Sequence, residues 1–135
     1  MVEYSSDKYI IDFGAIVPQL LLELSSNIIE KNNLALLFQE CHSILVKLLP
    51  TSLDNCKSRS IEHSHFYIGN DDPNNAFVSI VLKVMPGRSP DTLAKVSHAM
   101  LSALQNYFAE SLKKLNCQIS LEMMELQETY YKIKG

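Results

Sequence analysis

The residues that decide the fold read AFVSIVLKVMPGRSPD, at positions 76–91, and they join a β-rich run directly to a helix start. Residues 76–84 are apolar and rich in β-branched side chains, which predicts a central strand. Ser89 fits the N-cap of the following helix, Pro90 its first position, and Asp91 the positive end of its dipole. We therefore expect a strand followed closely by a helix.

Two stretches of the chain carry apolar residues at spacings of three and four, and each predicts a helix with one buried side. The first helix is expected over residues 34–48. Asn32 or Asn33 can cap its start, and Pro50 lies just past its end. The apolar stripe of the second helix covers residues 93–112.

Three further segments predict strands. Residues 19–24 form a short apolar run that ends at the turn-forming cluster 25–27. Residues 59–68 are β-rich, and a turn at residues 70–75 follows them. Residues 117–126 alternate between apolar and polar side chains, as a strand with one buried face does.

The expected element order is therefore β-α-β-β-α-β, which describes an α/β fold made of two β-α-β units. We expect a four-stranded sheet with both helices on one face. A ferredoxin-like fold has the same element order, so the pattern alone leaves both folds open. The strands carry Leu, Val and Met on both sides of the pleat. A partner subunit is the simplest cover for the face without helices.

The 135 residues have the size and composition of one small domain, with 47% hydrophobic and 20% charged residues. A net charge of −3 without basic runs argues against a nucleic-acid partner. No apolar run approaches the roughly 18 residues needed to cross a membrane, and no secretory signal is evident. Cys41, Cys56 and Cys117 form no CxxC motif, which argues against a disulfide framework and favours the cytoplasm.

Several segments together resemble the 5-carboxymethyl-2-hydroxymuconate isomerase family of the tautomerase superfamily. Residues 18–28, PQLLLELSSNI, resemble its first strand and turn, although the turn reads Ser-Ser-Asn where the family has Ser-Asp-Asn. The runs AFV and LKVMPGRS within residues 76–89 resemble its central strand and second helix start. ISLEMMEL at residues 119–126 resembles its last strand. The resemblance covers residues 18–135 as a tautomerase-like domain and leaves residues 1–17 as an N-terminal extension.

The resemblance implies a homotrimer with active sites near the subunit contacts and no metal or organic cofactor. The implied reaction moves a double bond by proton transfer in an unsaturated hydroxy or keto diacid such as 5-carboxymethyl-2-hydroxymuconate. Such a step belongs to the breakdown of aromatic compounds. The base would be the secondary amine of an N-terminal proline, and cationic side chains would hold the substrate carboxylate.

Pro18 is the expected base, provided that it carries a free amine. Seventeen residues precede it in this sequence, and an internal proline is an amide without a basic lone pair. A true start at Val17, read as Met and then trimmed, would free the amine, and so would proteolysis. The alternative is that Pro18 only begins a strand, where proline is tolerated.

Three cationic residues are the expected carboxylate ligands. Arg88 lies at a helix start, where a guanidinium and the helix dipole both favour an anion. The resemblance further implies that Lys57 and Arg59 bind substrate, as counterparts of the family's Arg-x-Arg. A lysine in place of the planar arginine leaves the identity of the substrate in doubt. The alternative for all three is a solvated surface charge.

Two other features of the sequence, a pair of histidines and the leading segment, give weaker indications of function. His63 and His65 lie two residues apart, but no third metal ligand is evident, so no metal site is expected. Residues 9–13 could add a strand if the leading segment is present in the native protein. The leading hypothesis is thus a cofactor-independent tautomerase, and the rival is a non-catalytic oligomeric module of the same fold.

Overall fold

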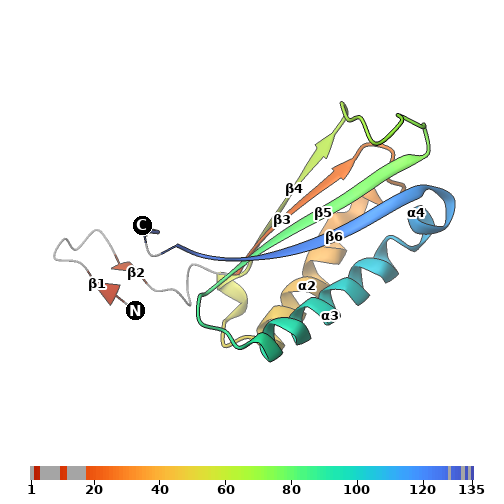
Figure 1. The fold of residues 1–135 in the computed structure, drawn as a ribbon. Helices are drawn as coiled ribbons and strands as arrows, with labels where there is room; N and C mark the ends of the chain where they lie inside the picture. The colour runs from red at the N-terminus through yellow and green to blue at the C-terminus, as the bar shows by residue number, and fades with distance from the viewer. Residues whose placement is uncertain (1, 4–9, 12–17, 128, 132, 134) are drawn as a thin grey trace.

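The computed structural model describes residues 2–3, 10–11, 18–127, 129–131, 133 and 135. A four-stranded sheet forms one layer of the molecule and helices form the other (Figure 1). The strands of this sheet are β3 (Gln19–Ser25), β4 (Lys57–His63), β5 (Asn75–Val84) and β6 (Asn116–Glu125). The helices are α2 (Leu34–Leu48), α3 (Pro90–Tyr107) and α4 (Ala109–Lys114).

The strand order β4-β3-β5-β6 separates the two folds that the element order left open. β3 pairs in parallel with β4, β5 pairs in parallel with β6, and β3 and β5 run antiparallel at the centre. The two strands of each β-α-β unit are thus direct neighbours, whereas a ferredoxin-like fold splits each unit around another strand. The predicted α/β fold with two β-α-β units is confirmed.

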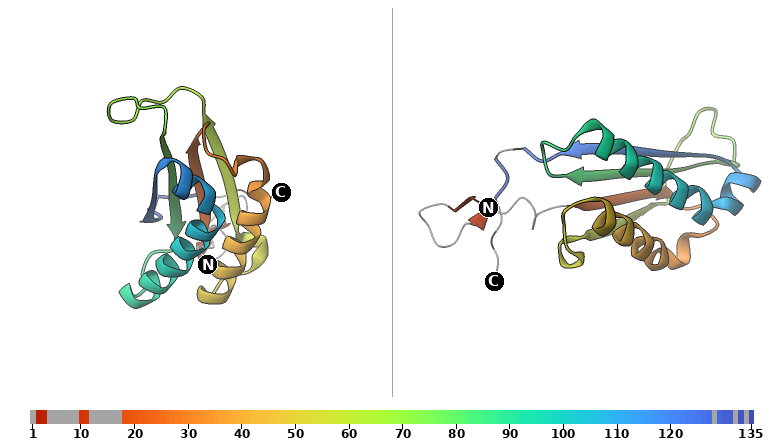
Figure 2. Two further views of the ribbon diagram at one scale, coloured as in Figure 1. Left: turned by 90° about the vertical axis from the view of Figure 1, so that its right-hand side faces the viewer. Right: turned by 90° about the horizontal axis from the view of Figure 1, so that it is seen from below.

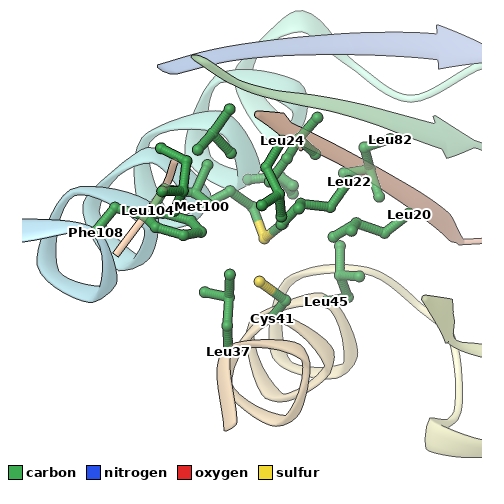
Figure 3. Packing of buried hydrophobic residues seen from close by; sticks show 14 of the residues in the cluster. Leu20, Leu22, Leu24, Leu37, Cys41, Leu45, Leu82, Met100, Leu104 and Phe108 are labelled. Carbon is green, nitrogen blue, oxygen red and sulfur yellow. The ribbon is translucent and has the colours of Figure 1, made fainter. Parts of the chain in front are cut away.

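Both long helices pack on the same face of the sheet, side by side (Figure 2). The core lies between the two layers (Figure 3). Alternate residues of β3 and β5 point into it, and the helices contribute one stripe each. Its members in the close-up are Leu20, Leu22, Leu24 and Leu82 from the sheet, with Leu37, Cys41, Leu45, Met100, Leu104 and Phe108 from the helices.

The local signals at the two helix starts had different outcomes. Ser89 caps α3 as predicted, because its hydroxyl accepts a hydrogen bond from the backbone N–H of Thr92 at 3.1 Å. Asn33 occupies the N-cap position of α2, but its side chain makes no capping hydrogen bond. A turn of 3₁₀ helix, Lys31–Asn33, leads into α2 instead.

The strand predicted at residues 59–68 starts two residues earlier in the structure and ends five residues earlier. β4 begins at Lys57 and ends at His63, which lies opposite Ser25, the last residue of β3. Residues 64–68 therefore have no neighbouring strand to pair with. The carbonyl of Ile68 instead accepts hydrogen bonds from the following turn.

The second predicted helix is interrupted near its end. α3 stops at Tyr107, and α4 resumes at Ala109. Phe108 between them is fully buried, and its backbone leaves the helical region at φ −94° and ψ 25°. The additional strand predicted within residues 9–13 is present at β2 (Ile10–Ile11), which pairs with β1 (Val2–Glu3). The rest of that stretch lies outside the described residues.

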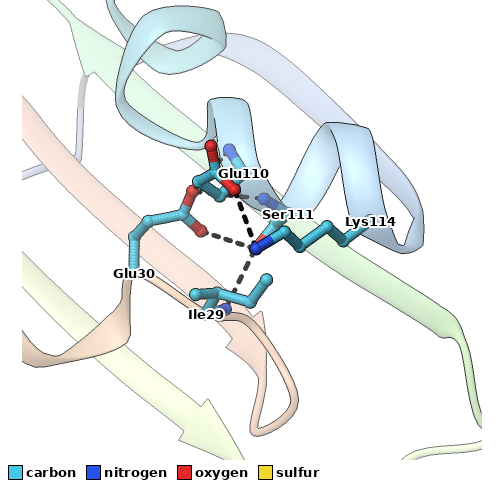
Figure 4. A network of polar contacts seen from close by, with 5 residues as sticks. All are labelled: Ile29, Glu30, Glu110, Ser111 and Lys114. Atoms are coloured by element: carbon cyan, nitrogen blue, oxygen red, sulfur yellow. Dashed lines mark hydrogen bonds and ion pairs between the residues drawn. The ribbon is translucent and has the colours of Figure 1, made fainter.

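A carboxylate from a distant loop caps α4 (Figure 4). Oε2 of Glu30 accepts hydrogen bonds from the backbone N–H groups of Glu110 and Ser111, at 2.9 and 3.2 Å. The Ser111 hydroxyl donates to Oε1 of Glu30 and accepts from the backbone N–H of Ile29 at 2.9 Å. The N-cap residue of α4 is Phe108, which has no capping group, so Glu30 supplies the acceptor that the helix start needs.

We expect the Glu30→Ala variant to lower the free energy of unfolding by about 1–3 kcal/mol, because the N–H groups of α4 and the buried Ser111 hydroxyl lose their acceptor. Urea denaturation measures this loss. The matched control is Glu110→Ala, which removes an exposed carboxylate whose ion pair with Lys114 should contribute less than about 1 kcal/mol. Equal losses in the two variants would contradict the capping role.

Candidate functional site

The structure brings two of the four predicted site residues into one pocket. Pro18 and Arg88 line it together at the end of the sheet where β3 begins. The other lining residues come from the end of α2 and the end of β5: Leu49, Pro50, Thr51, Val84 and Met85. Its volume is about 10 Å³, which is room for about one water. A dicarboxylate would need this pocket to open or to be extended by a further surface.

A backbone hydrogen bond to the start of β4 holds Pro18 in place. Its side chain is buried, and its carbonyl accepts from the backbone N–H of Lys57 at 3.2 Å. The register between β3 and β5 then sets Gln19 opposite Lys83. Pro18 therefore lies beside Val84, immediately before the loop that carries Arg88.

Arg88 is fixed between a turn and a helix cap. Gly87, before it, adopts φ +88°, a left-handed conformation that favours glycine, and Ser89 caps α3 directly after it. Nη2 of Arg88 contacts Sδ of Met85 at 3.6 Å, and Nε is buried without a hydrogen-bond partner. No carboxylate among the described residues forms an ion pair with Arg88. A cation with unused donors beside Pro18 is suited to an anionic ligand.

Lys57 and Arg59, the other two predicted ligands, do not line this pocket. Ser58 between them points toward the helices, where its hydroxyl lies 2.6 Å from Nε2 of His42. Because side chains alternate along a strand, Lys57 and Arg59 project from the opposite side of the sheet. Both are exposed on the edge strand β4, although the backbone of Lys57 adjoins Pro18.

The sheet side without helices, which we call the open face, mixes apolar and charged residues more than the strand composition suggested. Leu21 and Val81 lie opposite each other at its centre. Glu23 is also on this face, and its Oε1 lies 2.9 Å from Nε2 of His63, within hydrogen-bond distance. His65, the other candidate metal ligand, lies beyond the end of β4.

Sequence reasoning missed a contact between the two ends of the domain. Nε2 of Gln19 donates to the hydroxyl of Tyr130 at 3.1 Å, across 111 positions of sequence. β6 ends at the end of the sheet where Pro18 lies, and the segment after it makes this contact there (Figure 1). No local pattern signals a contact over this separation.

A larger groove, of about 680 Å³, lies on the outer side of α2. Gln39, His42, Ser43, Val46, Lys47 and Leu53 line it, and none of the predicted site residues is among them. Burial lowers the pKa of His42, so this side chain is neutral near pH 7. The groove is the larger of the two, but the Pro18 pocket is lined by a side chain with a buried nitrogen that has no hydrogen-bond partner, Nε of Arg88.

The three cysteines are free but not poised as nucleophiles. Burial, with a smaller contribution from Glu40, raises the pKa of Cys41 to about 12. Burial also raises the pKa of Cys56 and of Cys117. Thiols with raised pKa values stay protonated near neutral pH. Cys41 is instead a small side chain packed in the core.

Within the residues that the structure describes, no helix is both long enough and apolar enough to cross a membrane.

Among curated protein sequences, none matches this chain. A family model described as 5-carboxymethyl-2-hydroxymuconate isomerase matches residues 18–134.

Solved structures with the same fold carry related names. A 5-carboxymethyl-2-hydroxymuconate isomerase from Deinococcus radiodurans R1 has a TM-score of 0.80 at 23% identity, over 90% of this chain and 93% of that one. A 5-carboxymethyl-2-hydroxymuconate delta-isomerase also has a TM-score of 0.80, at 12% identity over 91% of each chain. A fused 4-OT wild type symmetric trimer has a TM-score of 0.65 at 13% identity, over 83% of this chain and 88% of that one.

These structural likenesses establish the tautomerase fold, and the family match adds the relationship in sequence. Because that match spans residues 18–134, most of the chain, this protein belongs to the 5-carboxymethyl-2-hydroxymuconate isomerase family and is an isomerase.

Proposed function

We propose that the protein moves a double bond by proton transfer in an unsaturated hydroxy or keto diacid such as 5-carboxymethyl-2-hydroxymuconate. The observation that carries this proposal is the pocket shared by Pro18 and Arg88, in which the guanidinium has a buried nitrogen without a partner. The reaction requires one base and a cation for the substrate carboxylate, and it needs no metal or organic cofactor.

Arg88 has the chemistry for the second of these tasks. A guanidinium can hold a carboxylate through two parallel hydrogen bonds, and it can also stabilise the negative charge that develops on an enolate. Partial burial strengthens both effects because it lowers the local dielectric constant. Arg88 is therefore proposed as a catalytic and substrate-binding residue.

Pro18 would be the base in a form of the protein that begins at this residue. A secondary amine close to a cation loses its proton more readily than one in water, which brings its pKa toward the working pH. We propose that residues 1–17 are an extension ahead of the domain and that catalysis needs their absence. Lys57, whose backbone adjoins Pro18, is proposed to add a second positive charge for a dicarboxylate. Arg59 is a weaker substrate-binding candidate because it lies further along the open face.

A non-catalytic oligomeric module is the second candidate function. It is favoured by the amide linkage of Pro18 in the full sequence, because an amide nitrogen cannot accept the substrate proton. The small volume of the Pro18 pocket also fits this reading. In either case, the free thiols and ordinary net charge are consistent with a cytoplasmic protein.

We expect a homotrimer in solution, in which the open face of each sheet is covered by neighbouring copies. Leu21 and Val81 are only half-buried on that face, which supports this assembly, and the name of one similar structure records a symmetric trimer. Light scattering at micromolar concentration measures the mass. A monomer would rule out the assembly.

The Arg88→Ala variant should weaken binding of a dicarboxylate competitor by about 1.5–3 kcal/mol, the contribution of a charge-assisted hydrogen bond. Titration calorimetry on the wild type and the variant measures this difference. The matched control is Lys113→Ala, which removes an exposed cation on α4, far from Pro18 in the fold. Binding that is unchanged in Arg88→Ala would remove this residue from the site.

A form that begins Met-Pro18, with the Met trimmed, should isomerise a 2-hydroxymuconate-type substrate at least about a hundred times faster than the full 135-residue chain. The reason is that the short form has an amine at Pro18 and the long form an amide, and general-base catalysis is typically worth about 10²–10⁴-fold. Both forms should fold and oligomerise alike, because β3 begins after the cut.

The control for this comparison is Pro18→Ala in the short form, which should keep partial activity because a primary amine is still a base. Intact-mass analysis of protein made from its native gene shows which form exists. Equal rates in the two forms would defeat the Pro18 mechanism, and inactivity of both would favour the non-catalytic module.

A further inference from the structure

One row of the open face carries opposite charges at its two ends. Arg59 on β4 lies opposite Leu21 on β3, Leu21 lies opposite Val81 on β5, and Val81 lies opposite Glu122 on β6. β4 and β6 are the two edge strands of the sheet. The row therefore runs from a cation at one edge, across an apolar centre, to an anion at the other.

The contacts on the helix side fix which way these side chains point. The neighbours of Glu122 in the chain, Leu121 and Met123, pack against the core, so Glu122 projects from the open face. Ser58 bonds His42 on α2, so the adjacent Arg59 projects from the same face as Glu122. Both side chains belong to exposed residues.

Neither charge has an ion-pair partner in the part of the chain that the structure describes. Three strand spacings separate the two edges by about 14 Å, too far for them to pair within one copy. Glu23, on the strand next to Arg59, is already paired with His63. Lys83, on the strand next to Glu122, lies one row away opposite Met124 and forms no ion pair.

This distribution of charge distinguishes between the two ways in which sheet edges of identical chains can meet. An edge-to-edge contact with two-fold symmetry would place β4 against β4, so that Lys57 and Arg59 of one copy face the same cations of the other. It could also place β6 against β6, and Glu122 would then face itself. A head-to-tail contact places β4 of one copy against β6 of the next, and opposite charges then meet.

We infer that Arg59 of one copy pairs with Glu122 of the next copy, where β4 of one meets β6 of the other. The inference rests on the proposed homotrimer and specifies its contact. In a closed ring each copy contributes its cation to one neighbour and its carboxylate to the other. Leu21 and Val81 then lie inside the ring, and Arg59, the weaker of the two substrate-binding candidates on β4, has its main contact with the neighbouring copy.

Charge reversal tests this pairing. The variants are Arg59→Glu, Glu122→Arg and the double variant that carries both, and sedimentation measures the concentration at which half of the chains dissociate. Each single reversal places like charges together and should raise that concentration about tenfold or more, because such contacts are strongly unfavourable. The double variant restores opposite charges and should return to within about threefold of the wild type.

Two controls make the same charge changes elsewhere on the surface. Lys113→Glu on α4 and Glu40→Arg on α2 alter exposed residues on the helix layer and should leave assembly unchanged. The neutral variant Arg59→Gln should weaken assembly less than Arg59→Glu. Circular dichroism would reveal a charge reversal that disturbs the strand. In that case the neutral variant Arg59→Gln still tests the pairing.

The outcomes separate this inference from the proposal on which it rests. A wild-type protein that is monomeric would overturn the homotrimer and the pairing together. A wild-type trimer whose dissociation is unchanged by either reversal would overturn the pairing and leave the homotrimer standing. Failure of the double variant to recover would likewise overturn the pairing.

Discussion

The antiparallel pairing of β3 with β5 is the constraint on which the rest of the structure depends. It joins the two β-α-β units, and its register sets Leu20 opposite Leu82 and Leu22 opposite Ile80 on the side that the helices cover. A slip of one residue would exchange the faces of a strand and bring charged side chains such as Glu23 into the core. The same register sets Pro18 beside the end of β5, and so beside the loop that holds Arg88.

Local sequence was sufficient where structure is decided locally. Ser89 and Pro90 predicted the start of α3 to the residue, and the alternation of residues 117–126 predicted which side of β6 is buried. The element order also gave the α/β class, but it could not distinguish the tautomerase fold from the ferredoxin-like fold, because that distinction depends on which strands are neighbours. The family resemblance favoured the correct one, and the strand order then decided it.

What sequence could not predict depends on partners that are distant along the chain. β4 ends at His63 because β3 has ended opposite it, although the β-rich run continues. The arrangement of the candidate site residues has the same limit. The family resemblance suggested Pro18, and the helix start suggested Arg88. The register brings these two together, while alternation about Ser58 turns Lys57 and Arg59 to the other side of the sheet.

The capping of α4 by Glu30 has a consequence for the order in which the chain folds. A helix of six residues is not stable by itself, because too few hydrogen bonds offset the cost of nucleation. Its cap comes from 80 positions earlier, so the entropy of closing a long loop must be overcome before α4 gains that support. Contacts at this separation slow folding and form after local ones. The capping hydrogen bonds of α4 can therefore form only when the first β-α-β unit has met the second, so this helix reaches its full stability late in folding.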